Sequence, residues 1–148
     1  MKDGLILGRG GDITYYFRSE LPTELYGKMH AELKRAVPIF ERLAEDFATL
    51  GGQATAGVAQ HVRCKWWLYT KTLLHSYRWY VDLYEAKLCY DNKNIEEMQK
   101  LLKRACATLE EYLELRKCAE YGEFENWYRD ELKMNVKEKL DITKQLLN

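Results

Sequence analysis

The chain has 148 residues, of which 47% are hydrophobic and 31% charged, a composition typical of one folded domain and unlike that of disordered chains. Lysine plus arginine equals aspartate plus glutamate at 23 each, so no net positive charge favours nucleic acid or an anionic membrane surface. The apolar run near the N-terminus, Leu5 to Leu7, is too short for a signal peptide or a membrane span. The composition predicts one soluble domain with neither nucleic acid nor a membrane as partner.

Residues 1–18 show no helical periodicity. They contain the short segments LIL, GRGGD and ITYYF. GRGGD lacks the spacing and the Lys-Ser/Thr ending of a phosphate-binding loop. We expect residues 1–18 to form an irregular or extended lead-in or linker, and residues 19–148 to form a helical domain.

The first predicted helix begins near Ser19. Apolar residues recur there at steps of three and four as far as Leu50, the spacing of one face of an α-helix. Pro22 suits the first turn, whereas Pro38 lies inside the helix and removes one backbone hydrogen bond, so we expect a bend there. The glycine-rich stretch 51–57 predicts the end of the helix.

The second predicted helix runs from about Thr55 to Tyr90 and has apolar residues on more than one face. One face carries Val62, Trp66, Tyr69, Leu73, Tyr77, Tyr80, Tyr84 and Leu88, and another carries Trp67, Leu74 and Val81. A helix with so wide an apolar surface is covered on several sides, so we expect it to be central. On that basis Leu73→Ala should cost about 2–5 kcal/mol of stability, as buried leucine truncations do.

Two capping boxes mark the starts of two further helices. Asn94 with Glu97 opens the third helix, which Gly122 ends, and Asn135 with Glu138 opens a shorter fourth helix. Short connections make successive helices antiparallel. The sequence therefore predicts an all-α fold, an antiparallel up-down bundle of three long helices plus a shorter C-terminal helix.

Hairpin geometry predicts which residues face each other on neighbouring helices. If the first two helices reverse near residue 52, His30 faces His75; such a pair suits a metal or a pH switch, although bonds to carbonyls or water are commoner. If the second and third helices reverse at 91–93, Cys64 faces Cys118. We expect these cysteines to remain thiols, as in the cytoplasm, whereas a disulfide between them would indicate an exported parent protein.

No metal or cofactor site is predicted. Di-iron sites in helical bundles use Glu-x-x-His pairs, and none is present. The residues three positions before His30, His61 and His75 are Gly27, Val58 and Thr72. The four cysteines have no CxxC spacing and no adjacent histidine, which argues against zinc.

Most aromatic side chains of the second helix recur at helical spacing, so we expect them in the core. Trp79 is the exception, because Arg78 and Asp82 flank it on a more polar face. This position makes Trp79 a candidate for contact with a ligand.

The stretch EYGEFENWYRDELKMNV, residues 120–136, combines aromatic and acidic side chains around Gly122. Its acids, which could supply the two carboxylates of glycoside hydrolysis, are Glu123, Glu125, Asp130 and Glu131. We prefer a structural interpretation, in which the aromatic residues cover the end of the bundle and the acids lie near a helix N-terminus. No catalytic residue is assigned. The candidate ligand-binding residues are Trp79, Trp127, Tyr128 and Arg129.

The segment LRKCAEYGEFENWYRDELKMNV, following a long helix with CKWWLYTKTLLHSYRWY, resembles the all-helical C-terminal region of large, poorly characterised bacterial glycoside-hydrolase-like proteins. The likeness spans most of residues 19–148. It implies a parent protein that acts on carbohydrate, with its catalytic carboxylates in a barrel that this chain does not contain. It would also make residues 1–18 the remnant of a linker.

Three functions follow as hypotheses. The first is a non-catalytic helical accessory domain that contacts another domain of a larger carbohydrate-active protein, or a second copy of itself. The second is a carbohydrate- or small-ligand-binding module that uses exposed aromatic residues. The third is a glycosidase-type enzyme that uses the acids after Gly122. An exposed apolar patch would favour the first hypothesis, and a pocket with convergent polar groups would favour the second or third.

Overall fold

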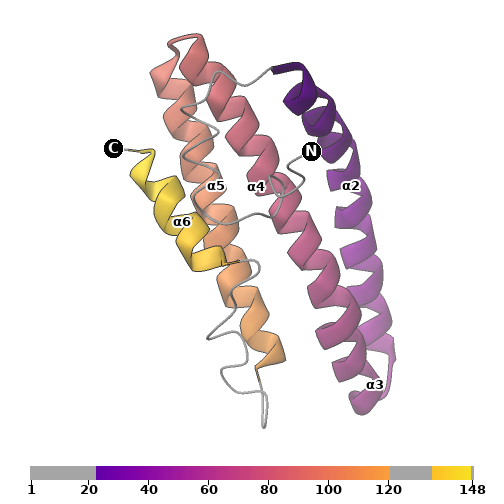
Figure 1. Ribbon diagram of the computed structural model, residues 1–148. Helices are drawn as coiled ribbons and strands as arrows, with labels where there is room; N and C mark the ends of the chain where they lie inside the picture. The colour runs from indigo at the N-terminus through magenta and orange to yellow at the C-terminus, as the bar shows by residue number, and fades with distance from the viewer. Residues whose placement is uncertain (1–22, 121–134, 148) are drawn as a thin grey trace.

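The computed structural model describes residues 23–120 and 135–147 (Figure 1). In chain order, its elements are α2 (Thr23–Gln53), α3 (Ala56–His61), the π-helical segment η2 (Val62–Trp67), α4 (Leu68–Asp91), α5 (Ile95–Leu115), the 3₁₀ turn η3 (Arg116–Ala119) and α6 (Val136–Gln145). Every regular element in these two ranges is helical, which confirms the all-α prediction for them. The predicted lead-in, residues 1–18, lies outside the described residues.

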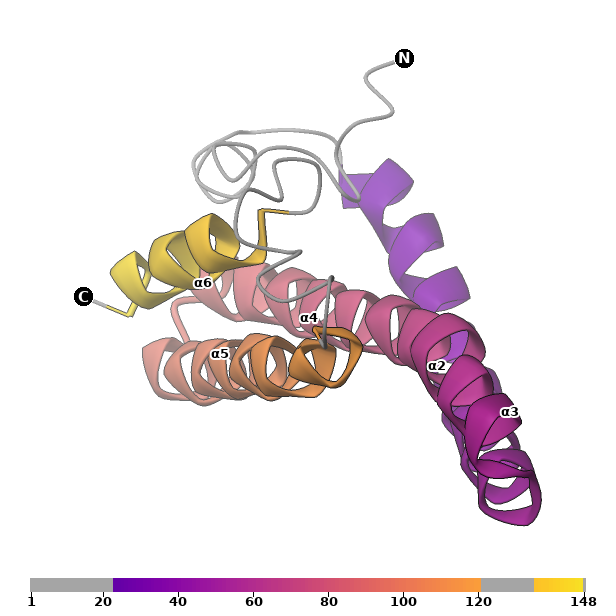
Figure 2. The same cartoon turned by 90° about the horizontal axis from the view of Figure 1, so that it is seen from below.

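Helix α4 occupies the middle of the structure. It packs along α5 on one side and along α2 on the other, and α6 packs on α5 (Figure 2). Seen from below, α2, α4 and α5 lie in a row, with α6 over one face of the α4–α5 pair (Figure 2). The all-helical character was predictable, whereas closure of the three long helices into a bundle stays a prediction.

The core follows the α4–α5 contact and extends to α2 and α6. Its most deeply buried apolar side chains include Leu74, Ala86, Leu102 and Ala105, each with at most 1% of its surface exposed. Leu33 joins this core from α2, and Val136 and Leu140 join it from α6.

Helix α2 continues through Pro38, the position at which a bend is predicted. Pro38 lies on the exposed side of α2, where water can bond the carbonyl that a proline leaves without a partner. The helix also runs through both glycines, Gly51 and Gly52, before it ends at Gln53. The predicted end of this helix is therefore correct to within two residues, but the reversal of the chain toward α4 comes later than expected.

The predicted second helix contains a π-helical segment that the sequence did not indicate. In η2 the N–H of Leu68 bonds the carbonyl of Arg63, five residues earlier, instead of the usual four. The wider turn rotates the residues before α4 relative to those within it. As a result Trp66 and Tyr69, which were expected inside, are 55% and 63% exposed.

The predicted register between the first two helices is wrong. His30 lies opposite Glu85, with Nε2 3.1 Å from Oε1, and Arg78 donates to Glu41 at 2.6 Å. The error arises because α2 extends past the glycines and α3 takes part in the reversal. His30 and His75 therefore do not form the expected pair.

The predicted register between the second and third helices is confirmed. Thr72 donates to the Tyr112 hydroxyl at 3.2 Å, and Cys64 Sγ donates to the carbonyl of Cys118 at 3.6 Å. This hairpin was predictable because its turn is short and well marked. The N–H of Glu97 bonds the side chain of Asn94 at 3.3 Å, so the first capping box supplies its N-terminal bond.

The fourth predicted helix begins at the expected position with a different cap. Asn135 adopts a left-handed conformation, with φ of 39°, and its side chain makes no bond to the backbone of α6. Its amide instead donates to the carboxylate of Glu138. The two residues of the predicted box therefore interact through their side chains.

The neighbours Leu73 and Leu74 provide a test of where the core of α4 lies. Leu74 is 1% exposed, whereas Leu73 is only partly buried. The loss of about 2–5 kcal/mol of stability that the sequence predicted for truncating Leu73 is therefore expected for Leu74 instead. We predict that Leu74→Ala lowers the free energy of unfolding by about 2–5 kcal/mol in urea denaturation and that Leu73→Ala lowers it by clearly less. Equal losses would show that the assigned rotation of α4 is incorrect.

Candidate functional site

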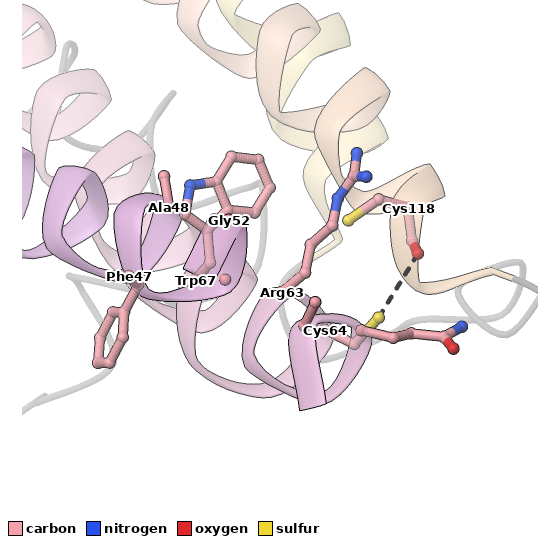
Figure 3. A pocket seen from close by; sticks show the side chains of 10 residues that line it. Phe47, Ala48, Gly52, Arg63, Cys64, Trp67 and Cys118 are labelled. Atoms are coloured by element: carbon pink, nitrogen blue, oxygen red, sulfur yellow. Dashed lines mark hydrogen bonds between the residues drawn. The ribbon is translucent and has the colours of Figure 1, made fainter. Parts of the chain in front are cut away.

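A cavity of 590 Å³ lies where α2, α3, η2 and the η3 turn after α5 approach one another (Figure 3). Its lining residues are Phe47, Ala48, Gly51, Gly52, Ala59, Gln60, Arg63, Cys64, Trp67 and Cys118. The volume is within the range of small-molecule binding sites. Small residues of α2 and α3 keep the space open, and larger side chains of η2 form its wall.

The π-helical segment supplies the three most distinctive lining residues. Arg63, Cys64 and Trp67 all belong to η2, and Figure 3 shows them around the same space. Single π-helical turns within α-helices are rare and frequent at functional sites. From its helical spacing Trp67 was expected in the core, and Arg63 was not among the predicted site residues. The sequence feature that could have indicated a site here is the pair Trp66 and Trp67 directly after Lys65.

Among the described residues, the lining of this cavity carries one positive charge and no acidic residue. The Arg63 guanidinium carbon lies 6.0 Å from the centre of the Trp67 ring, and Lys71 Nζ lies 5.8 Å from the same centre. These distances allow cation–π attraction. The described part of the chain shows no carboxylate ion-paired with either cation. The cavity wall therefore has a positive electrostatic bias.

Two free thiols lie at the α5 end of the cavity. Cys64 and Cys118 are both half-buried and are not joined by a disulfide; the Cys64 thiol instead donates to the Cys118 carbonyl (Figure 3). Burial raises the pKa of the Cys118 thiol, although the nearby Arg63 guanidinium opposes that effect. Because the thiolate is the reactive form, this environment favours a neutral, unreactive thiol at Cys118.

A second feature of the same helices is an exposed apolar face. On α2, Ile39, Leu43 and Leu50 recur at steps of four and seven residues, which places them on one side of the helix. Trp66 and Tyr69 are exposed on the neighbouring segment, and the Trp66 ring stacks on Phe47 of α2 with centroids 6.1 Å apart. We call Ile39, Leu43, Leu50, Trp66 and Tyr69 the α2–α4 face.

A charged hollow of 410 Å³ lies between α2 and α5 over α4. In it Asp82, which is 4% exposed, accepts two bonds from Arg104 Nε at 2.9 and 3.0 Å. Nearby, Glu85 accepts hydrogen bonds from Lys34 and His30. Burial raises the pKa of Glu85, but the two hydrogen bonds have the larger combined effect, so the pKa lies below its ordinary value. Since these charges are paired with one another, the hollow offers a ligand little unmatched charge.

The buried imidazole of His75 forms a hydrogen bond through only one of its two ring nitrogens. Its Nδ1 donates to the Lys71 carbonyl at 2.6 Å, and the ring is 1% exposed. Nε2 lies 3.3 Å from Glu111 Oε1 but makes no hydrogen bond. Burial lowers the pKa of His75 and outweighs the attraction of Glu111 for a positive ring. The folded state therefore favours the neutral imidazole.

The predicted site residues are not brought together within the described structure. Trp79 was expected on a polar face, but it is 3% exposed and its indole donates to Thr143 at 3.3 Å. It joins α4 to α6, because Lys139 Nζ also lies 5.6 Å from its ring centre. The other three candidates, Trp127, Tyr128 and Arg129, and the acids Glu123, Glu125, Asp130 and Glu131 lie outside the described residues.

Among the described residues, no three histidine, cysteine or acidic side chains converge as metal ligands. None of the described helices is both long and apolar enough to span a lipid bilayer. Comparisons with protein-family models, with curated proteins and with solved structures found no match to the chain. The resemblance to glycoside-hydrolase-like proteins therefore stays a prediction from sequence motifs.

The buried ring of His75 predicts a specific dependence of stability on pH. Because its pKa is below the ordinary value of 6.5 in the folded state, the unfolded chain takes up this proton at higher pH. The stabilising contribution is therefore complete above about pH 6.5 and is lost as the pH falls toward the folded pKa. We expect His75→Asn, which can retain a donor for Lys71, to flatten the fall in unfolding free energy between about pH 7.5 and 5. Urea denaturation across this range tests the prediction, and identical pH profiles would contradict it.

Proposed function

We propose that the chain is a non-catalytic helical interaction domain that docks onto another protein domain through the α2–α4 face. The observation that carries this proposal is the exposure of neighbouring large apolar side chains. Ile39, Leu50, Trp66 and Tyr69 are 65%, 51%, 55% and 63% exposed. Contiguous apolar surface of this kind is characteristic of protein–protein contacts, whereas single exposed apolar residues are ordinary.

The chemistry of the face also suits a protein partner. Tyrosine and tryptophan are enriched at such interfaces, because a ring contributes much contact area for little conformational entropy. Leu43 lies between Ile39 and Leu50 in the helical row and is 37% exposed. The five side chains thus provide an apolar surface for a partner to cover.

In this proposal the three long helices and α6 act as an antiparallel up-down bundle with α4 at its centre. The resemblance of the sequence motifs to glycoside-hydrolase-like proteins supports a partner within a larger carbohydrate-active protein. The principal alternative partner is a second copy of the chain. The cavity beside η2 favours a second candidate function, the binding of a small ligand, which the same domain can combine with docking.

Two matched double variants test the docking face. Leu43→Glu with Tyr69→Glu places charge on the face, and Ile95→Glu with Tyr90→Glu places the same charge at the opposite end of α4, where the two residues are 46% and 50% exposed. Since all four positions are exposed, we expect both variants to keep the melting temperature within about 2 °C. A loss of several degrees in the first variant alone would show that the face belongs to the domain's own core.

The partner itself is identified by a photo-crosslinking amino acid placed at Tyr69 in producing cells, with placement at Tyr90 as the control. We expect one defined adduct from position 69, abolished by Leu43→Glu, and none from position 90. An adduct of twice the chain mass identifies a second copy. Absence of any adduct, or an adduct that Leu43→Glu leaves unchanged, would contradict the proposed face.

A further inference from the structure

The cavity beside η2 has chemistry that docking through the α2–α4 face does not use. Its volume of 590 Å³ suits a ligand of about ten to twenty non-hydrogen atoms. It is lined by aromatic, small and sulfur-containing residues, with one amide and one guanidinium as its main polar groups. A mostly apolar wall with few polar groups is the usual composition of a small-molecule site.

The positive charge of Arg63 favours a ligand with a negative charge. Within the described ranges, Arg63 is the only lining residue that is ionised at neutral pH, and no aspartate or glutamate of these ranges lines the cavity. A cationic ligand would be repelled by Arg63, and a neutral ligand would not use it. An arginine binds a carboxylate through two parallel N–H bonds, which a planar guanidinium is shaped to make.

The number of donors selects a single negative charge. Besides the Arg63 guanidinium, the described lining residues offer one side-chain amide, that of Gln60. Phosphate esters carry nearly two charges and are commonly held by several cations or by a row of backbone N–H groups. One guanidinium and one amide match a carboxylate better.

The aromatic wall selects the body of the ligand. Trp67 lies in the wall next to Arg63 in space, with the guanidinium carbon 6.0 Å from the ring centre, and Phe47 lines the cavity from α2 (Figure 3). The body of a ligand whose carboxylate pairs with Arg63 can therefore contact the Trp67 ring directly. Flat apolar groups pack on such surfaces by offset stacking or edge contact.

We propose that this cavity binds a small organic monocarboxylate with a flat apolar body, its carboxylate paired with Arg63 and its body against Trp67. Gln60 supplies a further hydrogen bond at the mouth. The two thiols contribute polarizable contact surface rather than reactivity. The inference is independent of the docking face, because none of the five residues of that face lines the cavity.

Binding can be measured with 4-fluorophenylacetate as the probe, by fluorine NMR of the ligand titrated with the full chain. The neutral isostere 4-fluorophenylacetamide is the ligand control. Arg63→Gln removes the cation, and Arg42→Gln removes an exposed arginine of α2 that does not line the cavity. We expect saturable binding of the acid, a Kd at least about tenfold weaker for the amide and for Arg63→Gln, and no change for Arg42→Gln.

A second pair of variants tests the place of binding rather than the charge. A side chain at Gly52 meets no atom within 4 Å of its first carbon, and Gly52 lines the cavity. Gly57 is equally unobstructed but does not line it. Gly52→Leu should therefore fill the cavity and abolish probe binding, whereas Gly57→Leu should retain it, with circular dichroism confirming that both variants are folded.

Several outcomes would overturn the proposal. These are no saturable binding of 4-fluorophenylacetate at millimolar concentration, equal affinity for the acid and the amide, unchanged affinity in Arg63→Gln, and unchanged affinity in folded Gly52→Leu. Loss of probe binding in both arginine variants would also overturn it, because that result indicates attraction by overall charge rather than a site. Failure of the docking test leaves these measurements unaffected, so the two proposals fail separately.

Discussion

Helix α4 has to be covered on two opposite sides, and the rest of the structure depends on this requirement. Its side toward α5 buries His75 and Asp82, and its side toward α2 places Tyr77 and Tyr84 against Phe40 and His30. One neighbouring helix covers only part of such a surface. The chain therefore turns twice, at each end of α4, and places α2 and α5 on opposite flanks. This arrangement in a row leaves faces of the helices open.

The π-helical segment decides what the open end of the α2–α4 hairpin presents. One wide turn between Val62 and Trp67 brings Arg63, Cys64 and Trp67 to the cavity while Trp66 and Tyr69 remain exposed. An uninterrupted α-helix would rotate these residues relative to Leu68 and Leu74, which are buried. The same turn thus creates both the cavity and part of the apolar face. A ligand and a protein partner would meet the domain at adjacent but distinct surfaces.

Buried polar groups fix how the helices align. Asp82 and Arg104 join α4 to α5, and the Trp79 indole bonded to Thr143 joins α4 to α6. Such bonds add modest net stability, but an alternative register would leave their partners unsatisfied in the core at a cost of about 1–3 kcal/mol each. His75 is the exception, since its Nε2 has no hydrogen bond. Burial lowers the pKa of this ring, so we expect the stability of the domain to fall at mildly acidic pH.

Local sequence signals were sufficient for where α3, α5 and α6 begin and for one of the two hairpins, whereas α5 ends at Leu115, before the predicted stop at Gly122. Periodic apolar residues and the Asn94 cap predicted α5 and its alignment with α4, because a short turn leaves little freedom of register. The register of α2 could not be predicted in the same way. Glycines permit the end of a helix without requiring it, and α2 continued through Gly51 and Gly52.

The candidate site depended still more on tertiary structure. Apolar periodicity assumes 3.6 residues per turn, so it cannot reveal a π-helical turn, whose presence exposes Trp66 and turns Arg63 toward the cavity. Charge along the chain suggested a polar environment for Trp79, yet Thr143 and Lys139 come from α6, 60 or more positions later, and bury it. The amino-acid sequence by itself determined that this chain is helical and where most of its helices begin, because those features depend on neighbours within a few residues. Which aromatic residues are buried and which remain available to a partner was decided only when distant helices packed together, because exposure is a property of the assembled surface.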